Sequence, residues 1–147
     1  MRENRDEIII QAAPEEVWAV LTDMGKHEDW NPLIYHATGK IKLGEKVRLS
    51  AKTGSTDMNY TCLVVNVEPN REFKWKWHIV SPLLIRGEHT FTLEPAKENS
   101  TRFVNLEIFK GVLVPFLAKM LATDGKDGML AMDEALKNRV EQSVLPA

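Results

Sequence analysis

His89 and Glu107 are the residues whose types and spacing could support proton transfer. His89 falls in the alternating run 86–93, on the same side as its apolar members. A polar turn follows, and we consider the antiparallel register in which Pro95 lies opposite Thr101. In that register His89 lies opposite Glu107. A carboxylate beside an imidazole favours the protonated ring, fixes its tautomer and supports acid–base chemistry.

The same pair has a simpler interpretation. Two buried polar groups can satisfy each other, or orient a polar group of a ligand, without any reaction. The pairing also depends on strand register, because a slip of one residue would move Glu107 to the opposite face. The sequence therefore leaves open whether His89 and Glu107 are catalytic.

Aromatic side chains at alternate positions predict an apolar wall. Phe73, Trp75 and Trp77 share one face of the run 73–79, and the intervening polar residues share the other. Such a face could stack against a flat ligand, although aromatic residues on a strand more often form plain core. Tyr60 could offer a hydroxyl group to the same ligand.

Strands and helices must position these residues, and the chain order predicts them. A β-branched run at 7–10 forms the first strand, and Pro14 opens the first of two short helices. Turn signals divide 33–110 into about six strand-sized intervals, as in an antiparallel meander. A long helical stretch runs from about 113 to 140, and Gly125 and Gly128 predict a local irregularity within it.

A sheet of this size must bury one face, and only the final helix is long enough to lie across it. A curved sheet around a helix leaves an internal space if flexible residues such as Met129 and Met132 line it. Trp30 could cap the mouth of that space or join the short helices to the sheet. The residues expected to line the cavity are Trp30, Tyr60, Phe73, Trp75, Trp77, His89, Phe91, Glu107, Phe109, Met129 and Met132.

Several motifs resemble those of a known superfamily and keep their order along almost the whole chain. They are Ala13-Pro14-Glu15-Glu16-Val17-Trp18 with Leu21-Thr22-Asp23, Trp30-Asn31-Pro32, Gly87-Glu88-His89-Thr90-Phe91-Thr92-Leu93-Glu94-Pro95, Thr101-Arg102, and Glu107-Ile108-Phe109-Lys110-Gly111 with Pro115. The sequence resembles the START-like (SRPBCC) superfamily, and within it the polyketide cyclase/dehydrase-like branch. The resemblance implies an α+β helix-grip fold with an apolar cavity. In that fold a curved antiparallel sheet of about seven strands wraps around a long C-terminal helix, and two short helices follow the first strand.

Length and composition narrow the classes of function. A chain of 147 residues without linker-like or repetitive stretches predicts a single domain over 1–147. The formal net charge of −2 argues against a nucleic-acid partner. The first residues lack a signal-peptide pattern and no apolar run is long enough to span a membrane. We therefore expect a cytoplasmic protein without membrane insertion.

No cofactor or metal is expected. Cys62 is the single cysteine and cannot form a multi-cysteine metal site. His27 stands beside Glu28 and Asp29, but no further residue follows at the spacing of a metal ligand. The chain also lacks a glycine-rich phosphate loop and a nucleophile elbow, so nucleotide binding and hydrolase chemistry have no support.

The leading hypothesis is that the chain binds a small hydrophobic or amphipathic molecule in its cavity. The first alternative is a cyclase/dehydratase-type enzyme that uses His89 and Glu107 as an acid–base pair. The second alternative is a protein-interaction module, associated with chaperones or ribosomes as in some START-like branches. It is motivated by two strands with two apolar faces, at 60–67 and 103–109. These faces predict an outer surface covered by the short helices or by a second subunit in a homodimer.

Overall fold

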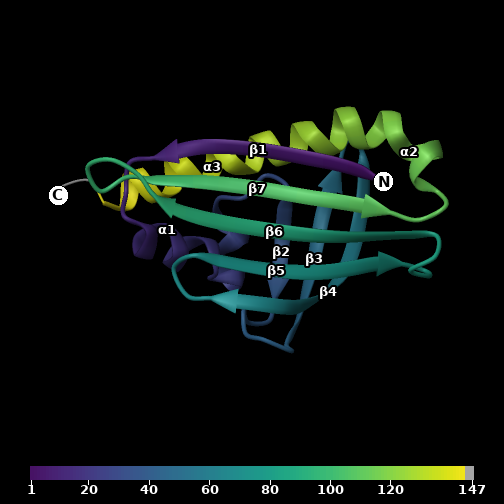
Figure 1. Ribbon diagram of the computed structural model, residues 1–147, viewed down its shortest axis with the longest axis horizontal. Coiled ribbons are helices and arrows are strands. Elements are labelled where there is room, and N and C mark those ends of the chain that lie inside the picture. Colours follow the sequence, from purple (N-terminus) through teal and green to yellow (C-terminus); the bar gives the residue numbers. More distant parts are fainter. Residues whose placement is uncertain (145–147) are drawn as a thin grey trace.

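The computed structural model describes residues 1–144. It contains one antiparallel sheet of seven strands (Figure 1). The strands are β1 (Arg2–Ile10), β2 (Ile34–Thr38), β3 (Lys46–Thr53), β4 (Thr56–Glu68), β5 (Glu72–Ile79), β6 (Ile85–Pro95) and β7 (Thr101–Lys110). Their order across the sheet is β1-β7-β6-β5-β4-β3-β2. The expected sheet is confirmed, and the final positions 145–147 of the expected domain lie outside the described residues.

Helices follow the first and the last strands, as the sequence predicted. They are α1 (Pro14–Leu21), the 3-10 helix η1 (Met24–Asp29), α2 (Val114–Met120), the π-helical turn η2 (Leu121–Gly125) and α3 (Lys126–Ser143). In Figure 1, α3 lies behind β1 and β7, while β2 and β3 run across the direction of β5–β7 because the sheet twists and curls around the helix. Among the described residues, no helix has both the length and the apolar character needed to cross a bilayer.

Period-two alternation decides which side chains face the long helix. In β5, Phe73, Trp75 and Trp77 are buried, whereas Lys76 and His78 are exposed. Each buried aromatic side chain stabilises the fold by roughly 1.5–3 kcal/mol relative to an exposed position. The predicted apolar face of this strand is therefore the inner face of the sheet.

A bulge in β4 changes one expectation about the outer face. The register with β5 shifts between Val64 and Asn66, so the next residue, Val67, pairs with the fully buried Phe73. Val67 therefore turns inward and packs against the core. Residues 63, 65 and 67 form one of the two apolar faces predicted for the strand at 60–67. This row does not continue past the bulge. A bulge adds one residue to a strand, and strict alternation cannot anticipate it.

The outer row of β7 consists of Val104, Leu106 and Ile108, which are half-buried. Long charged side chains of β1 stand beside this row, with Arg5 opposite Leu106 and Glu3 opposite Ile108. The aliphatic stems of such side chains can shield neighbouring apolar surface from water. Side chains of β1 thus shield part of the apolar row of β7. A second subunit on this face of the sheet remains a prediction.

The long C-terminal helix is interrupted at η2, where Gly125 had predicted an irregularity. Asn4 of β1 donates a 2.9 Å hydrogen bond from Nδ2 to the backbone oxygen of Leu121. The Asn4 side chain is buried, so water cannot easily replace this bond. A π-turn departs from the regular helical hydrogen-bond ladder, and β1 supplies a partner to one of its carbonyl groups.

Candidate functional site

A cavity of about 340 Å³ lies between the inner face of the sheet and the long helix. Its wall is mostly apolar, with strands β3 to β7 on one side and α2, η2 and α3 on the other. The expected residues that line it are Tyr60, Trp75, Trp77, His89, Phe91, Glu107, Phe109, Met129 and Met132. The structure thus brings together residues from four strands and from the helix.

Two of the expected residues, Phe73 and Trp30, lie elsewhere. Phe73 is fully buried behind the cavity, stacked on Phe91 with ring centroids 4.6 Å apart and edge-on to Trp18 at 5.7 Å. Trp30 packs on His27 with ring centroids 4.7 Å apart. Trp30 also packs against the buried core and does not line the cavity.

His89 and Glu107 meet inside the cavity. The register places Pro95 opposite Thr101 and His89 opposite Glu107. His89 Nδ1 contacts Glu107 Oε2, and both side chains are largely buried. The imidazole stacks on Phe91, with ring centroids 4.1 Å apart. An apolar surrounding strengthens such a contact, because the local dielectric is lower than in water.

Two polar residues that the sequence did not single out extend this pair. Asn105 on β7 and Asp133 on α3 are both fully buried. Asn105 Nδ2 donates a 2.8 Å hydrogen bond to Asp133 Oδ1, and Asn105 Oδ1 contacts His89 Nε2. The result is a continuous buried chain from Asp133 through Asn105 and His89 to Glu107. Spacing could have revealed Asp133, because it follows Met129 by four residues on the buried face of the helix.

Both ring nitrogens of His89 therefore have partners from the protein itself. Nδ1 faces Glu107, and Nε2 faces the carbonyl oxygen of Asn105. Of the linked groups, the Glu107 carboxyl lines the cavity and has a second oxygen, Oε1, beside the one that contacts His89.

Burial dominates the electrostatics of Asp133. It raises the pKa of the Asp133 carboxyl to about 8, and the neighbouring Asp6 of β1 adds to the increase. The amide of Asn105 and the charge of Lys126 oppose this increase. The Oδ2 atom is buried and has no hydrogen-bond partner of normal geometry among the described residues. A buried carboxylate with an unpartnered oxygen is costly, so the neutral acid is favoured at neutral pH.

The remaining candidate ligands for a metal do not cluster. Among residues 1–144, no group of three or more His, Cys, Asp or Glu side chains is arranged to hold a metal ion. Cys62 is buried on β4, and burial, followed by the charge of Glu107, raises the pKa of its thiol. Cys62 is therefore a thiol at neutral pH and forms a small apolar part of the cavity wall.

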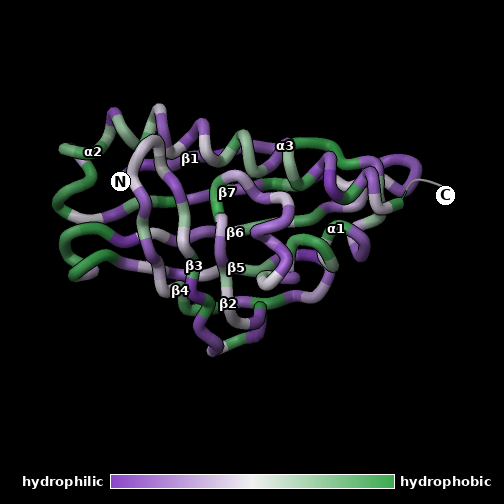
Figure 2. Tube along the Cα trace, turned by 180° about the vertical axis from the view of Figure 1, so that it is seen from behind, coloured by the Kyte–Doolittle hydropathy of each residue, from purple (hydrophilic) through white to green (hydrophobic). Residues whose placement is uncertain are grey.

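Exposed apolar side chains occur in the β5–β6 turn and on α2. Val80 and Leu83 in the β5–β6 turn are 88% and 75% exposed, and Phe116 on α2 is 83% exposed. The backbone N–H of Val112 donates a 3.0 Å hydrogen bond to the oxygen of Leu83, which joins the two segments. Figure 2 shows hydrophobic stretches gathered where α2 lies. Ile79 and Leu117 line the cavity close to these exposed positions in the sequence.

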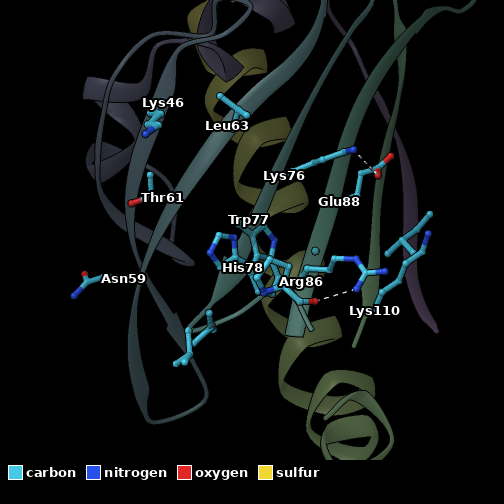
Figure 3. Close-up of a pocket in the computed structure, with 15 residues that line it drawn as sticks. Lys46, Asn59, Thr61, Leu63, Lys76, Trp77, His78, Arg86, Glu88 and Lys110 are labelled. Atoms are coloured by element: carbon cyan, nitrogen blue, oxygen red, sulfur yellow. Dashed lines mark hydrogen bonds and ion pairs between the residues drawn. The ribbon is translucent and has the colours of Figure 1, made fainter. Parts of the chain in front are cut away.

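A larger hollow of about 720 Å³ lies on the outer face of the sheet (Figure 3). Basic side chains from four strands surround it: Lys46, Lys76, Arg86 and Lys110. Glu88 pairs with Lys74 at 3.0 Å and lies 3.9 Å from Lys76. His89 and Glu107 do not line this hollow, so it is separate from the buried polar chain.

Comparison with models of protein families assigns the chain to a known family. The model of the family described as polyketide cyclase / dehydrase and lipid transport matches residues 1–141. The chain belongs to this family. Membership in the polyketide cyclase and lipid transport family confirms the resemblance drawn from the motifs. A search of curated proteins found no match.

Solved structures with the same fold come from several organisms. Protein MLL2253 from Mesorhizobium loti has a TM-score of 0.77 and 24% identity, covering 98% of this chain and 100% of that one. The Zhui aromatase/cyclase from a Streptomyces species has a TM-score of 0.82 and 17% identity, covering 98% and 96%. Norcoclaurine synthase from Thalictrum flavum has a TM-score of 0.73 and 15% identity, covering 97% and 95%. At these identities the likeness establishes the fold.

Proposed function

We propose that this chain binds a small hydrophobic or amphipathic molecule in the cavity between its sheet and its long helix. The distribution of polarity carries the proposal. Apolar and aromatic side chains form most of the wall, and the linked groups His89, Asn105 and Glu107 lie on β6 and β7. A ligand with an apolar body and one polar group would match both parts. The volume of about 340 Å³ lies near the lower end of the usual range for ligand sites, roughly 300–1,000 Å³.

Affinity would come mainly from burial of the apolar body. Each methylene group removed from water contributes about 0.8 kcal/mol, so a body of about ten such groups gains roughly 8 kcal/mol before the cost of association. A polar group paired with Glu107 would add orientation more than affinity, because it must first lose its hydration.

Binding of the neutral fluorescent probe N-phenylnaphthylamine tests the proposal. Met129 lines the cavity, whereas its neighbour Leu130 is exposed on the same helix. We expect saturable binding by the wild type, a loss of about tenfold or more in affinity for Met129→Trp, and an unchanged affinity for Leu130→Trp. Equal affinities in the two variants, both shown to be folded by circular dichroism, would place the probe outside the cavity and contradict the proposal.

A second candidate function is proton transfer of the cyclase/dehydratase type. The contact between His89 and Glu107 inside the cavity favours it. In this chemistry the Glu107 carboxylate removes a proton from the carbon next to a carbonyl group of the ligand. The electron pair of the broken C–H bond forms the enolate, and the new carboxylic acid returns the proton to oxygen or carbon. One structure with this fold is an aromatase/cyclase, which is consistent with such chemistry.

Deuterium exchange separates this candidate from binding alone. With α-tetralone in heavy water, the reaction predicts exchange next to the carbonyl group faster than in buffer. Glu107→Gln should abolish the excess rate, whereas Glu88→Gln on the outer face should retain it. An excess rate that survives Glu107→Gln, or a wild-type rate equal to that of buffer, would contradict proton transfer and leave the binding proposal in place.

A further inference from the structure

Asp133 is a buried ionisable group that neither ligand binding nor proton transfer at Glu107 requires directly. It lies on the inner face of α3 with no exposed surface. The groups that act on it come from each side of its pocket: Asp6 from β1, Asn105 from β7 and Lys126 from the first turn of α3. Of these three groups, Asn105 connects Asp133 to the cavity, because Asn105 also contacts His89.

When Asp133 is ionised, the hydrogens of the buried polar side chains from Asp133 to Glu107 have one possible arrangement. A carboxylate only accepts hydrogen bonds, so the Asn105 amide must turn its NH₂ group toward Asp133. The carbonyl oxygen of Asn105 then faces His89 Nε2, which must carry hydrogen. The single hydrogen of the neutral ring is then on Nε2, so His89 Nδ1 faces Glu107 Oε2 without a hydrogen.

A protonated Asp133 permits the opposite arrangement. Its O–H group can donate to the Asn105 oxygen once the amide has turned over. The NH₂ group then donates to His89 Nε2, which must be without hydrogen. The hydrogen of the neutral ring lies on Nδ1 and is donated to an ionised Glu107. This arrangement holds one proton more than the first, on Asp133, and the ring hydrogen has moved from Nε2 to Nδ1, so the two arrangements interconvert with pH.

We propose that Asp133 is a positioning residue for the cavity pair: its ionisation state orients the Asn105 amide, and that amide selects which nitrogen of His89 carries hydrogen. Glu107 is then a proton acceptor toward the ligand when Asp133 is protonated. The proposal deepens the proposed function, on which its biological purpose rests, but its physical content does not depend on any ligand.

The pH range of the effect follows from the surroundings of Asp133. Burial and Asp6 raise the pKa of Asp133 to about 8, while Lys126 works in the opposite direction. Around Glu107 the ionisable neighbours are His89 on β6 and Cys62 on β4, and burial keeps Cys62 protonated. We therefore expect hydrogen on His89 Nδ1 at pH 6–7 and on Nε2 once the pH exceeds about 8.

Nuclear magnetic resonance of the ring nitrogens of His89, in the ligand-free protein from pH 5 to 9.5, tests the proposal. Wild type should show the change of tautomer with a midpoint near that of Asp133. Asp133→Asn, whose amide can donate permanently to Asn105, should keep hydrogen on Nδ1 throughout. Glu134→Gln alters an exposed acid beside it on the same helix and should behave as wild type.

A milder variant covers the case in which Asp133→Asn does not fold. Asp6→Asn removes one cause of the raised pKa of Asp133, so the tautomer midpoint should shift to lower pH. Three results would each overturn the proposal. The first is an unchanged midpoint in Asp6→Asn, and the second is an identical tautomer profile in wild type and Asp133→Asn. The third is a ring with hydrogen on both nitrogens at neutral pH. Such a result leaves probe binding untouched, whereas a failure of probe binding leaves the tautomer result untouched.

Discussion

The indole of Trp77 lies over Gly87, its cross-strand partner on β6. A Cβ atom at position 87 would come within 2.2 Å of Trp77 Cε2, closer than any side chain could tolerate. The missing side chain therefore fixes the indole between Tyr60 and Phe109, with ring centroids 5.0 and 6.1 Å away. The shape of this part of the cavity wall depends on glycine at that position.

Gly87→Ala should displace the Trp77 indole from the cavity wall. Overpacking of this kind costs about 1–3 kcal/mol in the free energy of unfolding. Denaturant unfolding should report the loss of stability, and tryptophan emission should report the displacement of the indole. N-phenylnaphthylamine should also bind more weakly. Gly25→Ala is the matched control, because nothing lies within 4 Å of the added Cβ. Equal stability of the two variants would contradict the prediction.

Acidification should destabilise the protein through His27. Burial lowers its pKa, Nε2 donates to the backbone oxygen of Leu21 at 2.7 Å, and Nδ1 accepts from Asn31 at 3.1 Å. Below about pH 6.5 His27 binds a proton in the unfolded chain but not in the folded protein. The free energy of unfolding therefore falls by at most about 1.4 kcal/mol for each pH unit. The stability of the wild type relative to His27→Gln should therefore fall with this slope as the pH is lowered from 8 to 5, whereas a variant of exposed His36 should follow the wild type.

Asp133 should give the opposite slope between about pH 4 and 8. Its pKa is raised from 3.8 to about 8, so the folded state holds a proton that the unfolded chain releases. This contribution to stability is complete below about pH 4 and is lost as the pH rises toward 8. At pH 9, Asp133→Asn should be more stable than wild type by about 1–3 kcal/mol in denaturant unfolding. A variant less stable than wild type at that pH would show that the ionised group is well accommodated.

Asn4→Ala should loosen the long helix at η2. The variant removes the buried hydrogen bond to the oxygen of Leu121 and should cost about 1–2 kcal/mol. Hydrogen exchange should accelerate at the amides of 121–125 before the rest of α3 is affected. Glu3→Ala changes an exposed residue of the same strand and should leave the exchange rates unchanged.

Turn chemistry and alternation made the fold and part of the site predictable. The polar segment after Pro95 suggested a β6–β7 register with Glu107 opposite His89, and the structure has that register, although the sequence left a slip of one residue open. Alternation placed Trp75 and Trp77 on the inner face. These features are local, since each depends on residues close together in the chain.

The remaining features depend on contacts between distant segments. Asn105 and Asp133 are 28 residues apart, and a polar residue on an apolar face gives no indication of its partner. The bulge at Val65 required the actual pairing of β4 with β5. Trp30 has an aromatic partner, His27, within η1, and sequence alone could not decide between this contact and the cavity mouth.

The π-helical turn η2 gives the long helix a change of phase. An α-helix advances about 100° per residue, and a π-turn accommodates one more residue than an α-turn. If the same residues formed a regular α-helix, the stripe with Met129 and Leu136 would be rotated by about 100° from its present direction. With the π-turn, this stripe and the stripe with Val114 and Leu121 are both buried. Deleting one residue within η2 should therefore leave both halves of the helix in phase, whereas deleting one from the regular part of α3 would rotate every residue beyond it.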